Sequence, residues 1–252
     1  LSEQIGTLLY NRMLYEEIKN KAEGLEKLMR IIINVSSLVK EKDIIDKALN
    51  ESVKKLFNDS KGVIILFEEN MLIIKSAVGY EKSIVGKEIP VSSVAGWVCR
   101  NRKNLMIRDK TKIKFFNEKY ENEYFENKGI FVPIISEGRV KGVICITRKE
   151  NNYTREDLYF LSILENNIGG IIARTKLYED MKKDYINTIY SLAAAVDAKD
   201  HYTHGHSTTV MKYSTKIAEK MRLSEEEIEN IKYAALLHDI GKIGISEAII
   251  NK

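Results

Sequence analysis

Two histidines and an aspartate near the end of the 252-residue chain have the types and spacing of a metal site. His238 and Asp239 are adjacent in the otherwise apolar segment YAALLHDIGKIG, where a carboxylate beside an imidazole is costly unless a cation pairs with it. A divalent metal is such a cation, because imidazole and carboxylate are both common ligands. His206 lies about one helical hairpin earlier, so it can reach the same point.

Lys242 adds a positive charge to this cluster. It lies four residues beyond His238, on the same face if the helix continues, where it could contact a phosphate oxygen. The alternative is a satisfied core histidine at a helix end, with Asp239 as an ordinary cap. A lone histidine would favour that alternative, whereas the combination of four residues favours a metal.

Three helices are expected to position these residues. One ends near Asp200, one runs from His206 to about Met221, and one begins with the capping box Ser224 to Glu227 and runs to Gly241. The last third is therefore expected to be all-α. The other two histidines of the chain, His201 and His204, are interpreted as exposed loop residues.

Long helices are expected at both ends of the middle region. The first forty residues lack proline, and their apolar residues recur every seven positions. These are Ile18, Leu25, Ile32 and Val39, with Leu14, Leu28 and Val35 alongside. A second such pattern, from Leu161 to Val196, lies in a helix expected over 154–198. Both patterns suit a seam between two chains, and packing on the same domain is the alternative.

Six short β-rich runs separated by tight turns lie between these helices. They predict one antiparallel sheet. The runs are 62–67, 70–78, 87–91, 104–107, 129–135 and 139–147. Residues 92–103 are expected to form a short helix, and 108–128 form a charged segment with interleaved aromatic residues.

Composition excludes several classes of protein. The net charge of +4 is scattered, which argues against a nucleic-acid partner, and no apolar run approaches the length of a membrane span. The two cysteines, Cys99 and Cys145, are too few for a secreted disulfide scaffold and have no CxxC spacing, so a reducing cytoplasm is expected. The chain begins without Met and is expected to be part of a longer protein.

The middle region resembles a GAF domain. The matching pieces are the strand GVIILFEE, the segment IPVSSVAGWVCRNRKNLMIRD and the stretch from Phe131 to Asp180. The resemblance implies a sensory domain with an unidentified small-molecule ligand near four aromatic residues: Trp97, Phe115, Phe116 and Tyr120. Aromatic residues that only cap the core are the alternative. The residues that follow Cys99 and Cys145 do not match a covalent bilin site.

The last third resembles the start of an HD-GYP domain. DHYTHGHS and LLHDIGKIGI match its opening motifs, although Thr209 stands where that family usually has arginine. The resemblance implies hydrolysis of cyclic di-GMP with two or more metal ions, iron or manganese. His206, His238 and Asp239 would be metal ligands, and Asp239 and Lys242 would be catalytic. Three ligands are fewer than such a site needs, so this chain is expected to be inactive alone.

We therefore expect an α+β chain in which a GAF-like six-stranded antiparallel sheet is joined by a long helix to a truncated, all-α HD-type bundle. The expected parts are a helical linker (1–21), a GAF domain (22–180) and the HD-GYP start (181–252). A cytoplasmic parallel homodimer is expected. The alternatives are a non-enzymatic sensor and dimerisation module, or an HD phosphohydrolase that acts on another nucleotide.

Overall fold

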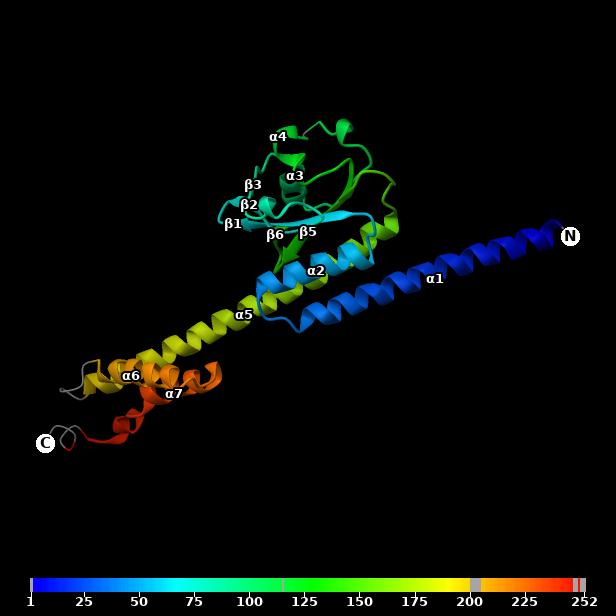
Figure 1. The fold of residues 1–252 in the computed structure, drawn as a ribbon. Coiled ribbons are helices and arrows are strands. Elements are labelled where there is room, and N and C mark those ends of the chain that lie inside the picture. Colours follow the sequence, from blue (N-terminus) through cyan, green and yellow to red (C-terminus); the bar gives the residue numbers. More distant parts are fainter. Residues whose placement is uncertain (1, 115, 200–204, 247–248, 250–252) are drawn as a thin grey trace. The chain divides into compact units, whose positions relative to one another are not determined.

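The computed structural model describes residues 2–114, 116–199, 205–246 and 249 (Figure 1). The chain folds as two compact units, residues 1–176 and 177–252. Within the described residues, no helix is both long and apolar enough to cross a membrane.

The first unit is built on a six-stranded antiparallel sheet with strand order β3-β2-β1-β6-β5-β4, which confirms the predicted fold class. Its strands are β1 (Lys61–Glu68), β2 (Met71–Val78), β3 (Glu88–Ile89), β4 (Leu105–Ile107), β5 (Lys128–Ser136) and β6 (Arg139–Arg148). β3 is shorter than predicted because it ends before Pro90, which has no N–H for the ladder.

Helices cover both faces of this sheet. One face carries α1 (Ser2–Ser36), α2 (Glu41–Lys55) and part of α5 (Arg155–Lys199). The other carries α3 (Val94–Asn101) and the segment with α4 (Glu118–Glu121) (Figure 1). The short 3₁₀ helices η1 (Lys82–Ile84) and η2 (Lys110–Lys112) complete the unit. Successive strand residues point to opposite faces, so Ile64 and Ile144 enter one core and Val63 and Val143 the other.

The N-terminal helix is shorter than predicted. α1 ends at Ser36, and a separate helix, α2, begins at Glu41. Leu28 and Val35 of the predicted seam are buried in the core of their own unit, whereas Ile18 is 58% exposed. The interpretation as a seam between chains is therefore wrong for Leu28 and Val35, whereas Leu25 of the same pattern is 40% exposed. The physical reason is that the sheet below α1 needs an apolar cover.

α5 begins as predicted. Thr154 and Asp157 cap each other: the Thr154 N–H donates to Asp157 Oδ2 (2.8 Å), and the Asp157 N–H donates to Thr154 Oγ1 (3.1 Å). Most of the predicted seam in this part of α5 is also buried in its own unit, at Leu161, Leu164 and Ile168.

A buried carboxylate fastens α5 to the sheet. Glu165 is 4% exposed and accepts a hydrogen bond from the Ile135 N–H (2.6 Å), next to an irregularity in the β5–β6 pairing. Gly169 lies so close that an added Cβ would meet the Ile135 carbonyl oxygen at 2.5 Å. The glycine therefore permits close packing of α5 on the sheet. Burial raises the pKa of Glu165 to about 7.

This carboxyl group gives a pH prediction. The unfolded chain loses the Glu165 proton at lower pH than the folded chain does. The contribution of Glu165 to the free energy of unfolding therefore falls as pH rises from about 4.5 to about 7. Glu165→Gln keeps the acceptor and cannot ionise, so its stability relative to wild type should increase between pH 5 and pH 8. Urea unfolding followed by fluorescence of Trp97, the single tryptophan, measures this difference. The exposed Glu179→Gln should show no such trend, and parallel pH profiles of wild type and Glu165→Gln would contradict the prediction.

The second unit contains the remainder of α5, α6 (His206–Lys220), α7 (Glu225–Leu237) and the 3₁₀ helix η3 (Ile240–Gly244). α6 and the capping box of α7, in which Ser224 and Glu227 bond reciprocally, match the prediction. A small core joins the three helices through Ile189, Met211 and Leu236. His201 and His204 lie outside the described residues.

The predicted end of the third helix is wrong. α7 ends at Leu237 rather than Gly241, and η3 follows at once. Asp239 has φ −100° and ψ 6°, outside the helical region, and Gly241 and Gly244 lower the helix propensity of the next turn. Lys242 therefore lies in η3 and not one turn further along the helix of His238.

Candidate metal centre

The structure brings His206, His238 and Asp239 together. His206 is the first residue of α6, His238 caps the end of α7, and Asp239 follows in the turn before η3. One ligand atom from each residue lies within 4.8 Å of those from the other two. The helical hairpin α6–α7 thus joins residues that are 32 positions apart in sequence.

The distance between the two imidazole rings suits ligands of one ion. Nε2 of His206 lies 3.3 Å from Nε2 of His238. Two nitrogens bound to one metal at about 2.0–2.1 Å are separated by roughly 3.0–3.4 Å. Asp239 Oδ2 lies 3.4 Å from His238 Nε2, so a carboxylate oxygen is also within reach. The geometry and the donor set both fit a divalent cation.

The ring of His238 is oriented for this role. Its Nδ1 lies 2.8 Å from the Ala235 carbonyl oxygen, which can only accept a hydrogen bond. Nδ1 therefore carries the proton in the neutral ring, and Nε2 presents a lone pair toward His206 and Asp239. A backbone acceptor behind the ring is the usual support of a metal-ligating histidine.

Lys242 contacts the carboxylate of the cluster. Its Nζ lies 2.7 Å from Asp239 Oδ2, and the hydrogen bond from Lys242 is the main reason that the pKa of Asp239 is lowered. Asp239 is thus held as an anion, the form that binds metal. The ammonium group lies beside the cluster, although it approaches from η3 rather than along α7.

The aromatic residues proposed for a ligand of the first unit lie on the α3–α4 side of the sheet. Trp97 and Phe116 pack partly buried against the second core, and Tyr120 is partly exposed. Phe115 lies outside the described residues. An open cavity of about 480 Å³ on this unit is lined by other residues, among them Lys61, Tyr80 and Lys110.

Sequence reasoning missed Asp197. It is 7% exposed, and it accepts hydrogen bonds from Ser207, the residue after His206. In the sequence it stands in AAAVDAKD, where an acidic residue looks like part of an exposed helix end. Only the placement of α6 against α5 shows that the side chain is buried.

Comparison with known proteins decides the family. The GAF domain family model matches residues 40–173, more than half of the chain. The chain belongs to the GAF domain family. A second model, for the HD domain, matches residues 203–252 and so includes the candidate metal centre. The GAF domain is thus followed by the beginning of an HD domain, as predicted.

Solved structures agree on the fold of the GAF domain. The GAF domain of a Coxiella burnetii phosphoenolpyruvate-protein phosphotransferase has a TM-score of 0.57 at 17% identity, covering 64% of this chain and 99% of that one. The corresponding Acinetobacter domain has a TM-score of 0.54 at 20% identity, covering 62% and 97%.

Curated relatives that match this GAF–HD chain are phosphodiesterases. It is 33% identical over 103 residues to 3'3'-cGAMP-specific phosphodiesterase 2 of Vibrio cholerae, covering 41% of this chain and 20% of that protein. It is 40% identical over 75 residues to a cyclic di-GMP phosphodiesterase of Thermotoga maritima, covering 30% and 20%. The chain spans a fifth or less of the length of these relatives.

Proposed function

We propose that the chain is the sensory GAF domain and the first part of the HD-GYP domain of a metal-dependent phosphodiesterase that hydrolyses cyclic di-GMP. The observation that carries the proposal is the convergence of His206, His238 and Asp239 beside Lys242. The relatives whose names specify cyclic di-GMP or 3'3'-cGAMP support a cyclic dinucleotide as substrate. On this proposal, residues 22–180 form the sensor and residues 181–252 begin the catalytic domain.

The proposed roles follow from the chemistry of each side chain. Nε2 of His206, Nε2 of His238 and a carboxylate oxygen of Asp239 would hold the ion, iron or manganese by the family resemblance. When bound, such an ion polarises a phosphoryl oxygen and helps to activate water. Lys242 balances Asp239, and its ammonium group is placed to neutralise charge on a phosphodiester. A small ligand near Trp97 and Tyr120 would regulate this activity.

Cyclic dinucleotide turnover tests the proposal directly. The complete protein, loaded with Mn²⁺ or Fe²⁺, should hydrolyse cyclic di-GMP in a metal-dependent manner. The 252-residue chain should bind metal weakly and turn over no substrate, because three protein ligands leave the other positions to water. The assay should include 3'3'-cGAMP and a panel of mononucleotides.

Each other outcome would contradict a specific part of the proposal. Turnover of 3'3'-cGAMP alone would show that cyclic di-GMP is not the substrate, while the proposed phosphodiester hydrolysis would stand. Turnover of mononucleotides alone would indicate a different HD phosphohydrolase. A complete protein that neither binds metal nor hydrolyses any of these compounds would be a sensor or dimerisation module.

We also propose that the chain forms a parallel homodimer through the first half of α1. Leu14 and Ile18 of the predicted seam remain exposed there, unlike Leu28 and Val35. Ile18→Asp should therefore weaken self-association about 10-fold or more, since it places a charge in an apolar seam. Light scattering at micromolar concentration measures this. The neighbouring Lys19→Asp is the matched control, and monomeric wild-type protein would contradict the prediction.

A further inference from the structure

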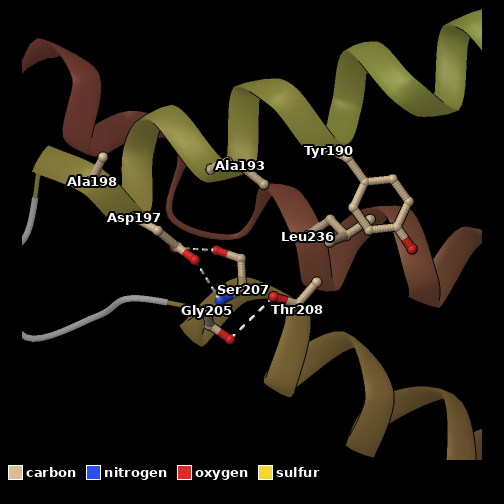
Figure 2. Close-up of a pocket in the computed structure, with 9 residues that line it drawn as sticks. Tyr190, Ala193, Asp197, Ala198, Gly205, Ser207, Thr208 and Leu236 are labelled. Carbon is tan, nitrogen blue, oxygen red and sulfur yellow. Dashed lines mark hydrogen bonds between the residues drawn. The ribbon is translucent and has the colours of Figure 1, made fainter.

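The start of α6 is held by a carboxylate from another helix. Gly205, at the N-cap position with φ 73°, has no side chain to cap α6. Asp197 of α5 instead accepts two hydrogen bonds from Ser207, one from its N–H (3.2 Å) and one from its hydroxyl (2.6 Å), as Figure 2 shows. Asp197 and Ser207 are both buried. An anion at this place is favoured by the free N–H groups and the dipole of the helix.

Hydrogen bonds hold the residues on both sides of His206. Ser207 follows His206 in the first turn, so Asp197 fixes the peptide on that side. On the other side, the Gly205 carbonyl oxygen accepts from the hydroxyl groups of Thr208 (3.2 Å) and Thr209 (2.8 Å). The backbone of His206 is thus restrained from both directions, with its ring 3.3 Å from that of His238.

A cavity borders the restrained turn. A cavity of about 380 Å³ lies beside the Asp197–Ser207 pair, between α5, the start of α6 and the end of α7 (Figure 2). Ala193, Ala198 and Leu236 contribute apolar walls to it. The hydrogen bonds from Ser207 to Asp197 hold the first turn of α6 at the edge of this cavity.

We infer that Asp197 is a positioning residue that sets the place of the His206 ring in the candidate metal centre. The inference rests on the proposed function to the extent that His206 is a metal ligand. Asp197 accepts both hydrogen bonds from Ser207, the residue that follows His206, so its effect reaches His206 through the backbone of α6.

Cobalt binding to the 252-residue chain tests the inference, with Co²⁺ alone as the probe. Asp197→Ala should weaken binding about 10- to 100-fold and change the visible absorption of the bound ion, as loss of an outer support of a ligand does. Asp197→Asn keeps an oxygen acceptor for Ser207 and should fall between wild type and Asp197→Ala. Ser224→Ala is the matched control, because it removes the N-cap of α7 in the same unit and leaves the start of α6 intact.

Affinity within twofold of wild type in Asp197→Ala, or an equal loss in Ser224→Ala, would overturn the inference. If Asp197→Ala has lost its helical circular dichroism, Asp197→Asn decides, and wild-type affinity in that variant would overturn the inference.

A second readout needs no metal. In the metal-free chain, the ¹⁵N resonances of the His206 ring should shift in Asp197→Ala and remain unchanged in Ser224→Ala. If wild type binds no Co²⁺, the proposed metal centre fails. The positioning role of Asp197 is then supported by a shifted His206 ring and overturned by an unshifted one.

Discussion

Asp239→Asn is expected to weaken Mn²⁺ binding to the 252-residue chain by roughly 100-fold or more, a larger loss than for an outer support of a ligand. Asparagine keeps the size of the side chain but removes the negative charge that offsets the cation. It also removes the carboxylate that pairs with Lys242 at 2.7 Å, so the ammonium group opposes a second cation beside it. Both changes oppose metal binding, so the effect should exceed that of losing one ligand oxygen.

Isothermal titration with Mn²⁺ measures this loss, and circular dichroism shows whether the helices remain. Glu226→Gln is the matched control, because it removes one carboxylate from the exposed first turn of α7, far along the helix from His238. Unchanged affinity in Asp239→Asn would remove Asp239 from the metal centre. An equal loss in Glu226→Gln would show that net charge alone governs the affinity.

The approach of His206 to His238 could be predicted from spacing because a helical hairpin has few alternatives. Two antiparallel helices joined by a short turn bring the end of the second helix near the start of the first. The capping box at Ser224 predicted where the second helix begins. The end of that helix could not be predicted. Apolar residues continue through Ile240, so the pattern did not show that α7 stops before Asp239.

The sheet was predicted well because its tight turns and β-rich runs are local signals. The role of the helices was not, since a stripe of apolar residues is the same whether it faces another chain or its own sheet. Leu28 and Ile18 illustrate this: they belong to one predicted seam, yet the first is 1% exposed and the second 58%. Asp197 was missed for a related reason, because its burial depends on where α6 lies.

Leu161→Ala is expected to destabilise the GAF domain by about 2–5 kcal/mol, since it removes buried apolar atoms and leaves a cavity. Leu161 is 0% exposed and lies in the core between α5 and the sheet. Leu177 lies on the same helix but is 57% exposed. Leu177→Ala should therefore change stability by no more than about 0.5 kcal/mol.

Urea unfolding followed by Trp97 fluorescence measures both variants, because the single tryptophan belongs to the GAF domain. The comparison separates two explanations of the seven-residue pattern in α5. If Leu161 packs in the core of its own chain, Leu161→Ala lowers the unfolding midpoint equally at all protein concentrations. If Leu161 packed in a seam between chains, the decrease in the unfolding midpoint would grow as the protein is concentrated, because association adds stability by mass action. Burial of Leu161 against its own sheet predicts the first result.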